Sequence, residues 1–196
     1  TQNTSWLLAT GSGGYAVSDS VPFTWKIVAS DKAGNSKSTT IDLEIDVTKP
    51  TLSSAVTGTA WDADDVEEDT GVNTSVKAVF SEPLDSSTVA AADFTVAGVA
   101  PTEVVVGTGS ASTTVYMTVA ALDPDAKPEV IVTGTVADDA GNAVDVTTSL
   151  TTNDATASDG LKPAITNTIS QGLSVKDDEI TFTVVATEKL AVGGLV

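Results

Sequence analysis

The stretch "SVKAVFSEPLDSSTVAAADFTVAG", residues 75–98, indicates the fold most clearly. Its first six residues alternate, so that Val76, Ala78 and Phe80 would lie on one face of a strand and Lys77 on the other. A period of two is typical of a β-strand with one buried face. The glutamate–proline pair that follows marks a turn, because proline fixes φ and cannot donate a ladder hydrogen bond. The stretch therefore predicts a half-buried strand followed by a turn.

The same alternation recurs elsewhere. It is present in "PFTWKIV" (22–28), "TVYMTV" (114–119) and "EITFTVVA" (179–186). It predicts that Trp25 lies in a core, and that Val115, Met117 and Val119 face inward while Tyr116 faces outward. Prolines and glycines separate such segments by roughly 8–12 residues, a spacing typical of β-sandwiches. Valine and threonine, which are abundant, also fit a pleated sheet better than a helix. We therefore predict an all-β fold made of sandwiches.

The composition excludes several functions. The 196 residues include 27 acids and 9 bases, for a formal charge of −18, and every base is lysine. Such a surface repels phosphate backbones, so we expect no binding to nucleic acid. The chain has no histidine and no cysteine, which removes the commonest general base and the thiol nucleophile, so we do not expect an enzyme. It contains no 18-residue apolar run, so we expect no membrane span in this sequence.

Three features occur twice, in the same order. The phrase Asp-x-Ala-Gly-Asn stands at residues 31–35 and 138–142, 107 residues apart (138 − 31). Glutamates in similar contexts stand at 82 and 188, 106 apart (188 − 82), and Lys-Pro pairs at 49–50 and 162–163, 113 apart (162 − 49). A period near 100 residues is that of one β-sandwich per repeat. The sequence therefore predicts a tandem array with one β-sandwich module per repeat.

The repeats suggest where the modules divide. We predict the C-terminal part of one module in residues 1–50, a complete module in 51–153, a linker in 154–163 and the N-terminal part of a third module in 164–196. A proline at each boundary would stiffen the linker by fixing φ. We expect no signal peptide at Thr1, and we expect the sequence to be a fragment of a longer protein.

The central stretch resembles a known family. "SVKAVFSEPLDSSTVAAADFTVAG" and the later "DDAGNAV" are similar to the bacterial and archaeal immunoglobulin-like (Ig-like) domains of surface-layer (S-layer) proteins and large cell-surface adhesins. The matching motifs lie at residues 80–85, 87–89, 93–96 and 138–142, so the resemblance covers residues 51–153. It implies an Ig-like sandwich with a structural or adhesive role outside the cell, at the cell surface. Such modules also serve as spacers, so the fold alone does not give the function.

The topology implied by this resemblance predicts a cation site. It places the last hairpin of a module and the loop after the second strand at the end where the chain enters. Acids of the first linker, of that loop and of the hairpin would then converge, with an asparagine beside them: Asp46, Glu82, Asp85, Asp138, Asp139 and Asn142. Hard oxygen ligands of this kind suit calcium. The structural alternative is that Asp-x-Ala-Gly-Asn, including its first copy at Asp31 and Asn35, is only a tight turn.

A second acidic segment allows two interpretations. Six acids fall between residues 62 and 69: Asp62, Asp64, Asp65, Glu67, Glu68 and Asp69. An EF-hand is excluded, because Glu67 stands where that loop needs glycine and Asn73 where it needs glutamate. The segment is either a solvated acidic loop or a second calcium site close to Asp154 and Asp159 of the following linker.

Two further side-chain types bear on surface chemistry. Asn3 and Asn73 stand in Asn-x-Ser/Thr sequons and are candidate glycosylation sites. Trp61 flanks the acidic segment and is either a platform for a sugar or a packing residue, of which we favour packing.

Three functions fit these observations. The first is a subunit of a surface layer or extracellular filament, in which Ig-like modules stiffened by calcium contact copies of the same chain. The second is the stalk of a large calcium-dependent adhesin, and the third is a spacer in a secreted polysaccharide-active enzyme. The drift between "FSEPLD" (80–85) and "ATEKLA" (186–191) favours the first, because stalks often use closely similar copies.

Overall fold

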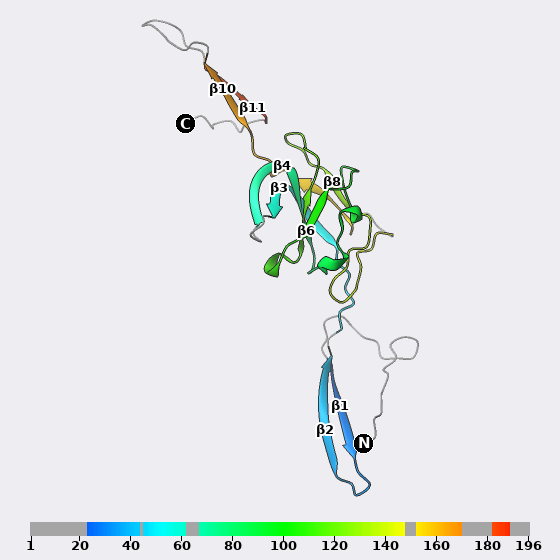
Figure 1. Cartoon of the computed structure of the whole chain (residues 1–196). Coiled ribbons are helices and arrows are strands. Elements are labelled where there is room, and N and C mark those ends of the chain that lie inside the picture. Colours follow the sequence, from blue (N-terminus) through cyan, green and yellow to red (C-terminus); the bar gives the residue numbers. More distant parts are fainter. Residues whose placement is uncertain (1–22, 44, 62–66, 148–151, 170–181, 189–196) are drawn as a thin grey trace.

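The computed structural model describes residues 23–43, 45–61, 67–147, 152–169 and 182–188. These residues form three successive β units: a two-stranded hairpin, a seven-stranded sheet and a second hairpin (Figure 1). The described residues contain three short 3-10 helices and no α-helix. No helix among them is long and apolar enough to cross a membrane. The all-β prediction is therefore confirmed.

The two hairpins flank the central unit. Strands β1 (Phe23–Ser30) and β2 (Ser36–Leu43) pair antiparallel, as do β10 (Ile165–Ile169) and β11 (Phe182–Ala186). A two-stranded sheet cannot bury a core by itself. Accordingly Ile27 and Ile41 remain 43% and 45% exposed, and Val184 of β11 is 49% exposed.

The central module consists of seven strands around one core. They are β3 (Leu52–Trp61), β4 (Glu67–Phe80), β5 (Phe94–Val96), β6 (Glu103–Val106), β7 (Thr114–Thr118), β8 (Glu129–Val132) and β9 (Asp154–Ser158). The order is β5-β8-β9-β3-β4-β7-β6, in which only β3 and β9 run parallel. The 3-10 helices η1 (Ser86–Thr88) and η2 (Ala91–Asp93) lie between β4 and β5, and η3 (Gly109–Ala111) lies between β6 and β7.

The core joins the two halves of this sheet into a sandwich. Val76, Ala78 and Phe80 of β4 are 0%, 0% and 3% exposed, as their alternation predicts. Phe80 meets Phe94 of β5 edge to face, with ring centroids 6.5 Å apart. This geometry is favourable for aromatic pairs. Val130 and Val132 of β8 complete the opposite side and are fully buried.

Strand β7 confirms one prediction and corrects another. Val115 and Met117 face the core and are 0% and 2% exposed, as expected. Tyr116 was expected to face solvent but is only 4% exposed. Its ring lies 5.0 Å from that of Trp61, centroid to centroid, and its hydroxyl donates to Glu67. A side chain of β3 therefore covers the outer face of the sheet, which strand periodicity does not predict.

The predicted linker 154–163 was wrong at its start. Residues 154–158 form β9, which pairs with β8 on one side and β3 on the other, and Ala157 is 1% exposed. The sequence hides this strand because its side chains are small or polar. The linker is therefore shorter than predicted and comprises residues 159–163, called here the second linker.

The second linker begins with the same turn as residues 46–50, called here the first linker. Asp46 Oδ1 accepts a hydrogen bond from the Thr48 amide, and Asp159 Oδ1 accepts one from the Leu161 amide, each at 3.0 Å. Such a bond to the amide two residues on defines an Asx turn. The two Asp-x-x-Lys-Pro linkers are therefore repeats in structure as well as in sequence.

Candidate cation site beside the first linker

The site begins with a tight turn at the second Asp-x-Ala-Gly-Asn phrase. The Asp138 amide donates to the Asn142 carbonyl and the Gly141 amide to the Asp138 carbonyl, both at 3.1 Å. Gly141 has φ 88°, a conformation that glycine adopts without strain. The Asp138 carboxylate closes the turn: Oδ1 accepts from the Asn142 amide at 2.8 Å and Oδ2 from Asn142 Nδ2 at 2.9 Å. Asp138 is 4% exposed.

Two other segments bring acids to this turn. Asn142 Nδ2 also donates to the Asp46 carbonyl at 3.2 Å, which joins the first linker to the turn. Thr51 exchanges hydrogen bonds with Ser81, through the Ser81 hydroxyl and the Ser81 amide, and this places Glu82 beside the linker. Ligand oxygens of Asp46, Glu82 and Asp138 all lie within 4.8 Å of one another.

The three carboxylates share a hollow on the surface. Pro83, Asp139 and Ala140 complete its lining. Asp46 is exposed, Glu82 is half-buried and Asp138 is buried. Like charges at this separation repel, and a cation among them would remove the repulsion.

Of the six residues predicted for this site, the structure brings the carboxylates of three together and gives the others different positions. Asp139 lines the hollow without joining the close group. Asn142 acts through its amide donors and holds Asp138 and the linker. The Asp85 carboxylate instead caps η1, because it accepts from the Ser87 amide at 2.9 Å. Hydrogen bonds from Ser87 hold the pKa of Asp85 below its usual value.

The second acidic segment is only partly described. Asp62, Asp64 and Asp65 lie outside the described residues, as does the side chain of Asp69. Glu67 has protein partners at both oxygens: Lys77 Nζ at 2.7 Å and the Tyr116 hydroxyl. Burial alone would raise the pKa of Glu67, but these two hydrogen bonds and the positive charge of Lys77 together outweigh burial and lower it. Glu67 therefore has a structural role, and Glu68 is exposed beside it.

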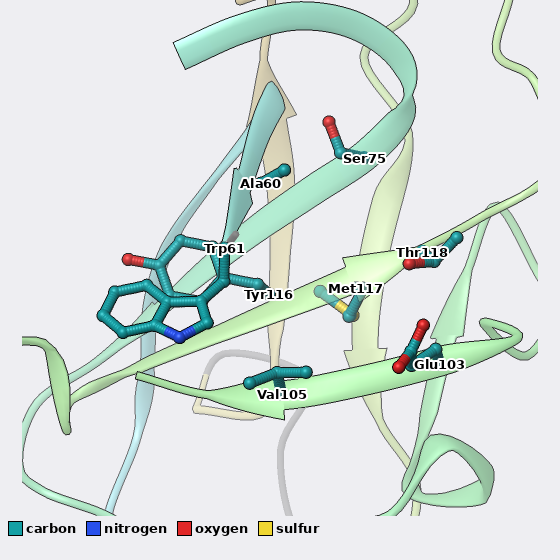
Figure 2. A pocket seen from close by; sticks show the side chains of 8 residues that line it. All are labelled: Ala60, Trp61, Ser75, Glu103, Val105, Tyr116, Met117 and Thr118. Carbon is teal, nitrogen blue, oxygen red and sulfur yellow. The ribbon is translucent and has the colours of Figure 1, made fainter. Parts of the chain in front are cut away.

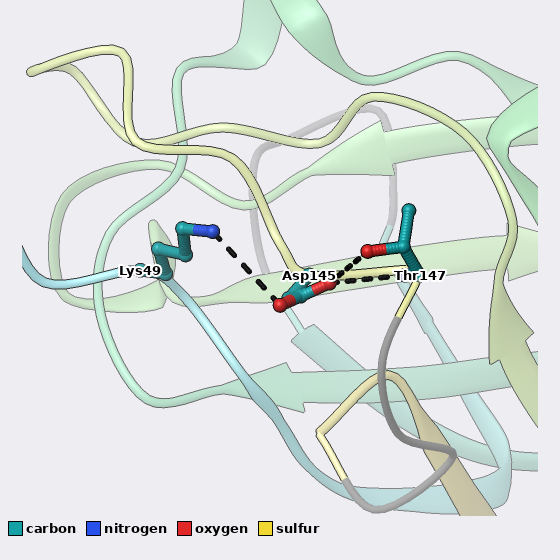
Figure 3. A network of polar contacts seen from close by, with 3 residues as sticks. All are labelled: Lys49, Asp145 and Thr147. Atoms are coloured by element: carbon teal, nitrogen blue, oxygen red, sulfur yellow. Dashed lines mark hydrogen bonds and ion pairs between the residues drawn. The ribbon is translucent and has the colours of Figure 1, made fainter.

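An ion pair that sequence reasoning missed also holds the first linker. Lys49 Nζ lies 4.0 Å from Asp145 Oδ2, three residues after Asn142 at the end of the Asp138 turn (Figure 3). Asp145 Oδ1 accepts from the amide of Thr147 at 3.0 Å and from its hydroxyl at 2.9 Å. The signal in the sequence was the repeated Lys-Pro pair, of which only the proline was interpreted.

Trp61 packs against Tyr116 and does not form an open platform for a sugar on that side. A cavity of about 90 Å³ lies between it, Tyr116 and Val105 (Figure 2). Small-molecule sites are roughly 300–1,000 Å³, so this cavity does not fit a sugar ring. A second, more open depression of about 480 Å³ also includes Trp61 in its lining, together with Glu67 and Lys77, which already pair with each other. These contacts favour the packing interpretation.

Of the two candidate glycosylation sites, the structure describes Asn73 but not Asn3. Asn73 is exposed but lies within β4, and its Nδ2, the atom to which a glycan would be attached, donates to the Leu122 carbonyl at 3.0 Å. Asn3 lies outside the described residues, as does the side chain of Trp25. Glycosylation at either asparagine remains a prediction.

One of three comparisons with known proteins found a match, and it supports the fold of the central module. A family model described as Bacterial Ig-like domain matches residues 46–152. The matched segment starts at Asp46, so it includes the first linker and the whole candidate site. No curated protein and no solved structure matches the chain.

Proposed function

From the premise that this chain belongs to the bacterial Ig-like domain family, we propose that it is a structural part of a surface layer or extracellular filament. Modules of this family are common in bacterial cell-surface and extracellular proteins and are typically structural, not catalytic. In this proposal the central module is one brick of a tandem array that contacts copies of the same chain. Calcium bound beside the first linker stiffens the connection to the preceding unit.

The observation that carries the calcium proposal is the meeting of three carboxylates from three separate segments. Asp46 comes from the linker, Glu82 from the loop after β4, and Asp138 from the last turn of the module. Carboxylate oxygens are the ligands calcium prefers, and its six to eight ligands leave places for backbone carbonyls and water. Each oxygen of Asp138 has a second lone pair beyond the one its hydrogen bond uses. The donor set therefore fits calcium.

An ion in this position would join segments that are far apart in the chain. It would hold the linker against the loop and the turn, so it would restrict rotation of the preceding hairpin relative to the central module. It would also stabilise the folded state by RT ln(1 + [L]/Kd), because the unfolded chain separates the three ligands.

Calorimetric melting of the full chain in calcium and in chelator tests the ion. We expect a higher melting temperature in calcium, and loss of that increase in Glu82→Gln, which keeps the size of the side chain but removes its charge. Asp31→Asn is the matched control, because Asp31 occupies the same turn but belongs to no close group of three acids in the described residues, and it should keep the full increase. An equal melting temperature with and without calcium would refute the site.

Sedimentation velocity at increasing protein concentration tests assembly. The array proposal expects larger species in calcium than in chelator. A monomer at all concentrations, combined with a calcium-dependent melting temperature, would favour the stalk of an adhesin over an array.

A further inference from the structure

We infer that the second linker is a rigid extension of the central module, which sets the direction of the β10–β11 hairpin without any metal ion. Only Pro163 separates residues held by the central module from residues held by the hairpin. This inference does not depend on calcium at the first linker.

The first element of this connection is a close backbone contact between β3 and the second linker. A Cβ built on Gly58 would lie 2.5 Å from the Gly160 carbonyl oxygen, and one built on Gly160 would lie 2.2 Å from that of Thr57. No side chain fits at either position without moving the backbone. Strand β3 makes room for the linker with register shifts on both sides of Gly58. These bulges re-aim the strand locally, so the linker lies directly on its backbone.

Hydrogen bonds hold the linker in this contact. The Gly160 amide donates to Thr57 Oγ1 at 3.0 Å, and Thr57 is 0% exposed. The Thr57 hydroxyl in turn lies 3.4 Å from the Ser158 carbonyl, to which it donates. A buried, satisfied hydroxyl of this kind is costly to disturb, because its partners would then be buried without a hydrogen bond.

The hold continues to the residue before the proline. Leu161 is 9% exposed, and the Lys162 amide donates to the Gly71 carbonyl of β4 at 3.4 Å. The Lys162 side chain covers Gly71 so closely that a Cβ there would lie 2.4 Å from Lys162 Cγ. The linker is thus held by both β3 and β4 up to residue 162.

The hairpin takes hold of the chain immediately after Pro163. The Ala164 amide donates to Thr187 Oγ1 at 2.9 Å, and the Thr187 amide donates to the Ala164 carbonyl at 3.0 Å. The single residue between the two held segments is a proline, whose ring fixes φ near −65°. A hinge needs residues that can absorb changes in φ and ψ. Between the two held segments, only ψ of Pro163 and the torsions of its immediate neighbours could absorb such changes.

Spin-label distance measurements on the full chain test this inference. The chain has no cysteine, so Glu129→Cys in β8 and Thr183→Cys in β11 place labels at two exposed positions on either side of the linker. We expect a narrow distance distribution that is the same in calcium and in chelator. A broad distribution in the parent chain would overturn the inference, whatever the calcium experiments above show.

A matched pair of glycine variants identifies the contact. Gly58 has φ 81° and Gly98 has φ 79°, so alanine is strained to a similar extent at both, but only Gly58 has atoms within 4 Å of the added Cβ. Gly58→Ala should widen the distribution by about twofold, as expected when a hinge is freed, whereas Gly98→Ala should leave it unchanged. Thr57→Val, which keeps the shape and removes the hydroxyl, should widen it to a smaller extent and decides the matter if Gly58→Ala does not fold. Unchanged width in a folded Gly58→Ala and in Thr57→Val would overturn the inference.

Discussion

The two Asp-x-Ala-Gly-Asn turns share four internal hydrogen bonds but have different surroundings. In both, the aspartate amide donates to the asparagine carbonyl, and both carboxylate oxygens accept from the asparagine. The glycines have φ 90° at Gly34 and 88° at Gly141. However, Asp31 is exposed, whereas Asp138 is 4% exposed and lies beside two other acids. The five residues are thus sufficient for the turn, and long-range neighbours make the difference between a turn and a candidate site.

The largest expected effect separates the two turns. Asp138→Ala removes the acceptor of the half-buried Asn142 amide and one of the two acceptors of Asn142 Nδ2, which should cost about 1–3 kcal/mol of the stability of the central module. Asp31→Ala should leave that stability unchanged, because Asp31 lies in the exposed β1–β2 hairpin. Urea unfolding followed by fluorescence of the tryptophans measures both. Equal losses would mean that the surroundings of the turn contribute nothing.

The next expected effect should be the same in both turns. Gly141→Ala and Gly34→Ala each force a side chain into positive φ, and neither added Cβ has an atom within 4 Å. We therefore expect only the local conformational cost, about 1–2 kcal/mol at each site. Amide hydrogen exchange at Asn142 and at Asn35 reports the two turns separately. A much greater cost at Gly141 would contradict the idea that the turn itself is local.

The smallest expected effect concerns acid. The side chain of Asn35, followed by its amide, lowers the pKa of Asp31 below the usual value. A carboxyl whose pKa is lowered by folding contributes stability above its unfolded pKa, and that contribution is lost as pH falls through the lower, folded pKa. Titration followed by carboxyl-carbon NMR should therefore give a lower midpoint for Asp31 in the parent chain than in Asn35→Ala. An identical midpoint would show that Asn35 does not act on the carboxylate.

Local patterns predicted much of the fold and part of the site. Alternation of apolar and polar residues identified the core-facing residues of β4 and β7. The Asp-x-Ala-Gly-Asn phrase identified both turns. Alternation did not reveal that Tyr116 is buried, because the covering residue, Trp61, comes from another strand. Strand β9 was missed because its strength lies in its two partners and not in apolar side chains. Pairing of this kind is a tertiary property that a single segment does not display.

The acids show the same limit. The topology implied by the family resemblance placed Asp46, Glu82 and Asp138 at one end of the sandwich, and their carboxylate oxygens lie within 4.8 Å of one another. Asp85 was misplaced, because a local partner two residues on, the Ser87 amide, takes its carboxylate. Side chains such as aspartate often bond to nearby backbone, and this competes with longer-range roles.

The parallel pairing of β3 and β9 has a mechanical consequence. The chain reaches the central module at the start of β3 and leaves it after the end of β9, and the two strands pair through Ala55 with Ala157 and Val56 with Ser158. A pulling force on the two linkers would drag these strands past each other along their length. Their hydrogen bonds would then be loaded in shear, all at once, and would not peel apart one by one. Tension applied along such an array would therefore meet its resistance where the first and last strands of the module lie side by side.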